Sequence, residues 1–287
     1  MHILLSTLVY YLAGSVIAGS IMGAGFATNL SGRPNGRELK SLQRIGTYVP
    51  LNLDGIDGGL IARAAERRPT IVYIHGRSAN RMELAPLAQA MFNEGYNAVL
   101  WDSKSRPISY GPKEIKQVRM IVEFIRNDPH VQINQIYLVG FSLGAAIAIG
   151  AASADTDHYI RGIVADSPYA DLKNVASRYV TAFGAIPKTV AWPARTVAFA
   201  TAKWMHEIEF ESLNPADWAR GVSCGVFLIH GKLDKRIPHT HSEEILERLD
   251  TDKELWLVEG AGHTKAFSSS PAEYMRRVRD FLNRNGS

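Results

Sequence analysis

The chain has 287 residues, of which 46% are hydrophobic and 21% are charged, and its formal net charge at pH 7 is +4. This balance is typical of a globular protein with a substantial core, and the length suits one large α/β domain. The basic residues are scattered without zinc-finger or RNA-binding signatures, which argues against nucleic-acid binding, and the single cysteine excludes an internal disulfide.

The N-terminal segment from Ile3 to Ala27 contains no Asp, Glu, Lys, Arg or His side chain. Because about 20 apolar residues cross the core of a bilayer, residues 1–27 are predicted to be a transmembrane anchor, followed by a polar linker over 28–43. A cleaved signal peptide, with the small residues 18–20 as its cleavage site, is one alternative, although its basic n-region is missing. A helix buried in a soluble core is the other.

Basic residues follow this segment directly: Arg33, Arg37, Lys40 and Arg44. Positively charged flanks of a membrane span tend to stay in the cytoplasm. The sequence therefore predicts a membrane-anchored, single-pass protein whose main domain lies on the cytoplasmic side.

Residues 44–287 alternate short apolar runs with longer amphipathic ones, after a predicted antiparallel hairpin over 46–53 and 58–65. The apolar runs have the length and β-branched content of buried strands and cover 70–75, 97–102, 135–141, 162–167, 225–230 and 254–259. Helical spacing recurs between them at 83–94, 113–126, 143–154, 240–249 and 271–284. This alternation predicts an α/β fold with a mostly parallel central sheet and helices on both faces.

Residues 171–222 interrupt this rhythm between the sixth and seventh predicted strands. The segment shows no strand pattern, is rich in aromatic side chains, and carries Pro187 and Pro193, which are expected to divide it into short helical pieces. Open α/β sheets bind ligands at the carboxyl ends of their strands. An apolar insertion after one strand end therefore predicts a helical lid over that edge.

The stretch GFSLG, residues 140–144, lies where a predicted strand ends and a helix of small residues begins. A sharp strand-to-helix turn exposes a serine hydroxyl above the sheet edge and crowds the backbone, so glycines are needed two positions away on either side. The turn also places the Leu143 amide at a helix N-terminus, where it can stabilise an oxyanion. In this context the pattern predicts that Ser142 is a nucleophile.

A serine nucleophile needs a base to accept its proton, and the base needs an orienting acid. Of the six histidines downstream of Ser142, only His263 lies in a glycine-rich loop after the last predicted strand, and it is the predicted base. Asp234, in the loop after the penultimate strand, is the predicted acid. Asp166, at the end of the strand before that one, is its rival, with a structural role as the alternative.

The second oxyanion donor is expected in the loop that follows the strand over 70–75. Gly76 permits a close backbone turn there, so the amide of Arg77 can face the site, while the Arg77 side chain is expected to be solvated. His75 is expected to brace this loop. Among the other histidines, His230 is expected to be buried, and the pair at 239 and 241 to face solvent.

Residues 44–285 resemble the serine α/β-hydrolase superfamily, and within it the bacterial, membrane-anchored members described as serine aminopeptidase-like or lysophospholipase-like. The matching pieces, in family order, are HGRSANR, GFSLGAA, DSPYADL, HGKLDKRIP and VEGAGH. The resemblance implies an α/β-hydrolase fold. It also implies a nucleophile, an acid, a base and two oxyanion-hole amides at Ser142, Asp234, His263, Arg77 and Leu143 respectively.

The leading functional hypothesis is a serine hydrolase that cleaves small or lipid-like carboxylic esters through an acyl-enzyme on Ser142. Peptide or amide hydrolysis is the alternative, with Glu207, Glu209 and Glu211 as a carboxylate cluster that holds a free amino terminus. A membrane-tethered scaffold that only binds is the third hypothesis. Neither a metal nor a cofactor is expected, since no H-E-x-x-H, C-x-x-C, P-loop or dinucleotide-binding pattern occurs.

Overall fold

The computed structural model describes residues 16–21, 34, 36–63, 66–104, 108–182 and 188–286. The chain divides into two compact units. The smaller unit comprises Met1–Asn29, Arg106–Tyr110 and Asp171–Asn214, and the larger unit comprises Leu30–Ser105, Gly111–Ala170 and Pro215–Ser287.

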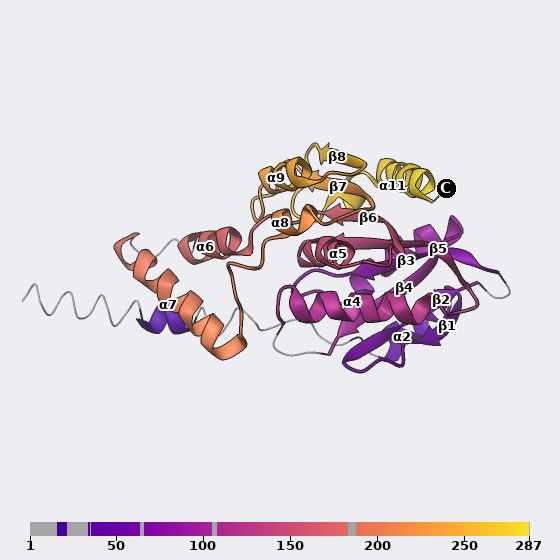
Figure 1. Cartoon of the computed structure of the whole chain (residues 1–287), viewed down its shortest axis with the longest axis horizontal. Helices are drawn as coiled ribbons and strands as arrows, with labels where there is room; N and C mark the ends of the chain where they lie inside the picture. The colour runs from indigo at the N-terminus through magenta and orange to yellow at the C-terminus, as the bar shows by residue number, and fades with distance from the viewer. Residues whose placement is uncertain are drawn as a thin grey trace, which may run out of the picture. The chain divides into compact units, whose positions relative to one another are not determined.

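The larger unit is built on a sheet that has eight strands within the described residues (Figure 1). The strands are β1 (Thr47–Pro50), β2 (Ile56–Ala62), β3 (Arg68–Ile74), β4 (Asn97–Ser103), β5 (Val131–Phe141), β6 (Ile160–Asp166), β7 (Gly225–Gly231) and β8 (Lys253–Val258). Their order is β1-β2-β4-β3-β5-β6-β7-β8. The pairs β1–β2 and β2–β4 are antiparallel and the other five are parallel. The predicted mostly parallel sheet behind an N-terminal hairpin is confirmed.

One face of the sheet packs against α3 (Ala85–Asn93) and α11 (Pro271–Asn285). Alternate strand residues face these helices, because successive side chains of a strand point to opposite faces. The shared core includes, from the strands, Ile71, Tyr73, Tyr137, Val139, Phe227 and Ile229, and from the helices, Leu87, Met91, Phe92, Tyr274, Val278 and Phe281. The Tyr96 hydroxyl, just after α3, donates to the Asn283 side chain of α11 at 3.1 Å.

The second helical layer contains α5 (Leu143–Ser153), which contacts α4 (Pro112–Ile125) and α8 (Pro215–Ala219), while α8 contacts α9 (Thr240–Arg248). All residues of α5 up to Ala152 are buried, which explains its run of small side chains. A Cβ on Gly150 would lie 2.4 Å from Ile115 of α4 and 2.9 Å from Trp218 of α8. The small residues therefore let three helices pack closely behind the strand that carries Ser142.

The smaller unit contains α6 (Leu172–Ala182) and α7 (Lys188–His206), both within the insertion predicted over 171–222. The expected break at Pro193 is wrong, since α7 continues through it. Ala194, Ala198 and Ala202 are fully buried at a spacing of four, so packing along one face of the helix outweighs the hydrogen bond that proline removes. Pro187 lies outside the described residues, and the placement of this insertion over the sheet edge stays a prediction.

Short helical elements complete the described chain: α2 (Gly36–Leu42), η1 (Arg81–Leu84) and α10 (Ala266–Ser269). The first of them lies inside the stretch predicted to be a linker over 28–43. Of the other two, η1 follows the loop after β3 and α10 follows the loop after β8.

The predicted transmembrane anchor over 1–27 is wrong. Among the described residues no helix combines the length and the apolar character needed to cross a bilayer. The described part of the segment is a helix over 16–21; residues 1–15 and 22–27 lie outside the described residues. The prediction of a membrane-anchored, single-pass protein with its catalytic domain on the cytoplasmic side is contradicted with it.

Candidate active site

Ser142 stands alone between the last residue of β5 and the first residue of α5, with φ 54° and ψ −115°. Residues other than glycine rarely adopt this positive φ, and such strain is concentrated at functional sites. A Cβ on Gly140 would lie 2.3 Å from the carbonyl oxygen of Gly144, and one on Gly144 would lie 2.0 Å from that of Ile74. These contacts explain why glycine stands on both sides of the serine.

The side chains of Ser142, His263 and Asp234 form a hydrogen-bonded chain. Nε2 of His263 lies 2.9 Å from Oγ of Ser142, and Nδ1 of His263 lies 2.6 Å from Oδ2 of Asp234. A carboxylate can only accept, so Nδ1 carries the proton and Nε2 is left to accept the serine hydroxyl hydrogen. The fold thus brings together three residues that sequence separations of 121 and 29 keep apart in the chain.

Asp234 is held as an ionised acceptor in a buried position. Its Oδ1 accepts hydrogen bonds from the amides of Arg236 and Ile237, each at 2.9 Å. Burial by itself raises the pKa of Asp234, but the hydrogen bonds from His230, His263 and the Ile237 amide outweigh it and hold this pKa well below its usual range. The carboxylate therefore stays charged and can orient and stabilise a protonated His263.

His230 supports Asp234 from the other side, a role that the sequence reasoning missed. This histidine is fully buried, as expected, with Nε2 2.8 Å from the Ile237 carbonyl and 3.3 Å from Oδ2 of Asp234, and Nδ1 2.7 Å from the Ser242 hydroxyl. Because Nε2 faces only acceptors in these contacts, it carries a proton, and Ser242 donates to Nδ1. The signal in the sequence was the spacing of four residues between His230 and Asp234.

His241 corrects another expectation. It was expected to face solvent at the start of a helix, but it is 5% exposed, and its Nδ1 accepts a hydrogen bond from the Ala170 amide at 3.3 Å. The first turn of α9 packs against the loop after β6, which the local sequence pattern does not reveal.

Asp166, the rival acid, is not bonded to the ring of His263. Its side chain is fully buried at the end of β6, and Oδ1 accepts a hydrogen bond from the Ser167 hydroxyl at 2.8 Å. Burial raises the pKa of Asp166 to about 6. The direct contact of Asp234 with His263 makes Asp234 the better candidate acid.

The two predicted oxyanion donors belong to segments that border Ser142. Leu143 is the first residue of α5, so its amide has no acceptor within the helix. A Cβ on Gly76 would lie 3.4 Å from Cβ of Ser142, which places the loop after β3 directly against the serine turn. Arg77 is the next residue in that loop.

A network of polar side chains around the buried Arg81 fixes the loop after β3. His75 contacts the Gly76 carbonyl through Nδ1 at 2.8 Å and Oδ1 of Asp102 through Nε2 at 3.3 Å. The side chain of Arg81 is 1% exposed, lies 3.5 Å from Oδ2 of Asp102, and also pairs with Asp57. The bracing role expected for His75 thus extends to Asp102 and Arg81, which the sequence analysis did not single out.

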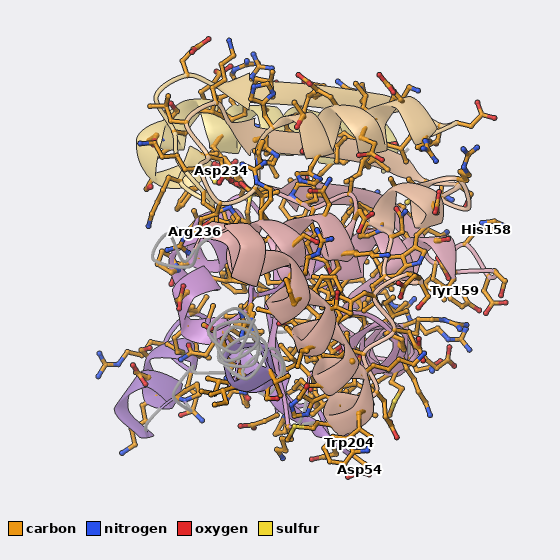
Figure 2. The ribbon with its side chains drawn as sticks, turned by 90° about the vertical axis from the view of Figure 1, so that its left-hand side faces the viewer. Asp54, His158, Tyr159, Trp204, Asp234 and Arg236 are labelled. Carbon is orange, nitrogen blue, oxygen red and sulfur yellow. The ribbon has the colours of Figure 1, made fainter. Side chains whose placement is uncertain are left out.

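A cavity of 370 Å³ opens beside Ser142. It is lined by His75, Gly76, Arg77, Ser78, Ala79, Glu83, Leu84, Leu87, Phe141, Ser142, Arg236, Thr264, Lys265, Phe267 and Ser268. Arg236 comes from the same loop as Asp234 (Figure 2). The cavity therefore combines the serine, the loop after β3 and the two loops that carry Asp234 and His263.

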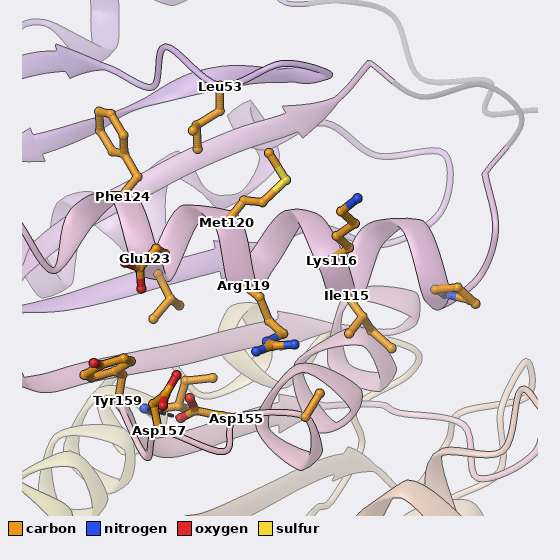
Figure 3. A pocket seen from close by; sticks show the side chains of 14 residues that line it. Leu53, Ile115, Lys116, Arg119, Met120, Glu123, Phe124, Asp155, Asp157 and Tyr159 are labelled. Atoms are coloured by element: carbon orange, nitrogen blue, oxygen red, sulfur yellow. Dashed lines mark hydrogen bonds between the residues drawn. The ribbon is translucent and has the colours of Figure 1, made fainter.

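A second cavity, of 660 Å³, lies along α4 and the segment before β6 (Figure 3). Apolar side chains such as Leu53, Met120 and Phe124 line it together with charged ones such as Arg119 and Asp155. No serine, cysteine or histidine is among its lining residues, so it offers no comparable nucleophile. Within the described ranges, no group of three His, Cys, Asp or Glu side chains is arranged to hold a metal ion.

The order of the sheet, the serine turn between β5 and α5, and the loops after β7 and β8 define an α/β-hydrolase fold, as predicted. Comparison with known proteins agrees. The family model described as BD-FAE matches residues 60–249, more than half of the chain, so the chain belongs to this family.

Two solved structures illustrate the likeness in fold. An esterase of Pyrococcus furiosus, Pf2001, is 23% identical with a TM-score of 0.73, over 92% of this chain and 100% of that one. The α/β hydrolase GrgF from Penicillium sp. sh18 is 20% identical with a TM-score of 0.65, over 83% of this chain and 98% of that one. In sequence, the uncharacterized protein YqkD of Bacillus subtilis (strain 168) is 24% identical over 219 residues, 74% of this chain and 70% of its own length.

Proposed function

We propose that this protein is a serine hydrolase that cleaves carboxylic esters through an acyl-enzyme formed on Ser142. The observation that carries the proposal is the hydrogen-bonded chain from Oγ of Ser142 through His263 to Asp234, with distances of 2.9 and 2.6 Å. Membership of the BD-FAE family and the fold shared with esterases support it.

In the proposed first half-reaction, Oγ of Ser142 attacks the ester carbonyl while Nε2 of His263 accepts the hydroxyl proton. The carbonyl oxygen becomes an oxyanion, which the amides of Leu143 and Arg77 stabilise. The protonated His263 then donates that proton to the leaving alcohol oxygen as the carbon–oxygen bond breaks. Asp234 stabilises the charged imidazole without taking its proton.

In the second half-reaction, water enters the place of the alcohol. His263 accepts a proton from this water, whose oxygen attacks the acyl carbon bound to Oγ of Ser142. The collapse of the second tetrahedral intermediate releases the carboxylic acid and returns the proton to Ser142. Apart from the ester and one water molecule, no co-reactant is needed to balance the two halves.

Amide or peptide hydrolysis is less well supported. This hypothesis requires Glu207, Glu209 and Glu211 to form a carboxylate cluster that binds a free amino terminus. Instead, Glu209 pairs with Lys203 at 2.9 Å and Glu211 pairs with Lys173 at 3.0 Å. Two of the three carboxylates are thus already matched with cations of the same unit.

The experiment is hydrolysis of p-nitrophenyl esters from acetyl to palmitoyl by the wild-type protein and its Ser142→Ala variant. We expect turnover in the wild type and a fall in kcat of at least about 10³-fold in the variant. Ser41→Ala is the matched control, since Ser41 lies on α2 and bonds the Glu38 carbonyl. Equal turnover by Ser142→Ala and wild type would reject the proposal, and absence of turnover in both would favour a scaffold that only binds.

A further inference from the structure

The cavity beside Ser142 has an unequal distribution of charge. Three cationic side chains line it, those of Arg77, Arg236 and Lys265, against one carboxylate, that of Glu83. A site that only held neutral acyl chains would gain nothing from such a lining, because cations at an apolar surface favour water or an anion. The excess of positive charge in the lining therefore favours a ligand that carries a negative charge.

Two of these cations come from the loops that hold the proposed triad. Arg236 follows Asp234 by two residues, and its amide donates to Oδ1 of Asp234 at 2.9 Å. Lys265 follows His263 by two residues, and its amide donates to the Gly262 carbonyl at 3.2 Å. The backbone bonds that shape the triad loops thus also fix where these two side chains leave the backbone.

Neither Arg236 nor Lys265 has an ion-pair partner among the described residues. Cations elsewhere on the larger unit are often paired, for example Lys232 with Glu259, and both Arg276 and Arg277 with Glu273. Two unpaired cations at one cavity leave positive charge available for a ligand.

The rest of the lining sets the size and polarity of that ligand. The side chains of Leu84, Leu87, Phe141 and Phe267 supply an apolar surface beside the serine. A volume of 370 Å³ lies at the small end of the range for ligand sites, about 300–1,000 Å³. The cavity therefore suits a small ester with an apolar body and a charged end.

We propose that this cavity selects esters that carry a carboxylate, which Arg236 and Lys265 bind while Ser142 attacks the ester carbonyl. The planar guanidinium of arginine matches a carboxylate with two parallel hydrogen bonds, and the lysine adds a compact positive charge. This inference rests on the proposed function, and it names the substrate class of the same site.

The test compares matched ester pairs that differ by one carboxylate. p-Nitrophenyl hemiglutarate against p-nitrophenyl butyrate places the charge in the acyl part, and 4-acetoxybenzoate against its methyl ester places it in the leaving group. We expect kcat/KM to favour the charged member of at least one pair by about tenfold, because a charge-assisted hydrogen bond is typically worth that factor or more. The pair that shows the preference identifies which part of the ester enters the cavity.

Variants test whether these two side chains cause the preference. Arg236→Gln and Lys265→Gln should each lower the charged-to-neutral ratio of kcat/KM by about tenfold, and Arg236→Glu should invert it. Lys235→Gln is the matched control, because Lys235 is exposed on the same loop but does not line the cavity, and it should keep the wild-type ratio.

The outcomes separate the two claims. Neutral esters cleaved in a Ser142-dependent way, with no preference for either charged ester, would overturn the carboxylate inference and leave the hydrolase proposal intact. A preference unchanged in both Gln variants would also overturn it. Ester cleavage that survives Ser142→Ala would overturn the proposed function itself, and the inference with it.

Discussion

The hydroxyl of Ser167 accepts a hydrogen bond at 3.1 Å from the amide of Thr264, the residue that follows His263. The same hydroxyl donates to Oδ1 of Asp166 at 2.8 Å. Ser167 and Thr264 both have positive φ, 56° and 54°, which residues other than glycine rarely adopt. The end of β6 is therefore tied to the loop that presents His263.

Removing this tie should slow the reaction. Ser167→Ala leaves the Thr264 amide without its acceptor and lets the loop of His263 move, so we expect kcat to fall about tenfold while KM changes little. Steady-state kinetics on a p-nitrophenyl ester measures this. Ser223→Ala serves as control, because it removes a serine–histidine contact with His158 instead. An unchanged kcat in Ser167→Ala would show that the tie does not position the base.

Asp166 should make the protein less stable as the pH rises. Burial raises its pKa from 3.8 to about 6 in the folded state, so the unfolded chain releases this proton at lower pH than the folded one. Stability is then lost between those two pH values and does not recover above pH 6.

The Asp166→Asn variant has no carboxyl group at this position, so it does not titrate in this pH range. The free energy of unfolding of the variant minus that of the wild type should therefore rise by about 1 kcal/mol from pH 5 to pH 8. This change does not depend on the value of the difference at pH 5. Urea unfolding of both proteins at the two pH values gives the difference. A gap that stays constant, or moves in favour of the wild type, contradicts a raised pKa at Asp166.

The glycines around Ser142 should tolerate no side chain. Gly144→Ala would place a Cβ 2.0 Å from the carbonyl oxygen of Ile74, so the strand and helix must separate, at a cost of about 3 kcal/mol. Gly262→Ala is the control, because nothing lies within 4 Å of the added Cβ. Thermal unfolding should show a large fall in Tm for the first variant only, and equal Tm values would contradict the packing.

The network below the loop after β3 should matter for stability as well as rate. Arg81→Met removes the buried guanidinium that pairs with Asp102 and Asp57, and we expect a loss of about 3 kcal/mol together with a lower kcat. Arg276→Met, which breaks exposed pairs with Glu273 and Asp280, should cost less than about 1 kcal/mol. Denaturant unfolding compares the two, and equal costs would count against a structural role for the buried network.

Much of the fold was predictable because its signals are local. The six parallel strands are recognisable as short apolar runs. Part of the glycine spacing around Ser142 is also local, since a Cβ on Gly140 would meet the carbonyl oxygen of Gly144, whereas the contact that excludes a Cβ on Gly144 is with Ile74 of β3. Candidate site residues could be found because each follows a predicted strand, and parallel strands end at one edge of the sheet.

The sequence-based predictions failed where tertiary contacts, and not the local sequence pattern, determine the structure. A buried alanine face carries α7 through Pro193, although proline locally disfavours a helix interior. The network of Arg81, Asp102 and His75 joins three segments, and no periodicity reveals it. The apolar composition of residues 1–27 indicated a membrane span, whereas a Cβ on Gly19, in the helix over 16–21, would lie 2.5 Å from the Ala194 carbonyl oxygen of α7.

The most direct test of the central claim is covalent labelling with a fluorophosphonate, followed by mass spectrometry of the digested protein. If the hydroxyl of Ser142 is activated by His263, the adduct should appear on the peptide that contains Ser142. Labelling should slow by about 10³-fold or more in His263→Ala. An adduct on another residue, or labelling that does not depend on His263, would contradict the proposed nucleophile.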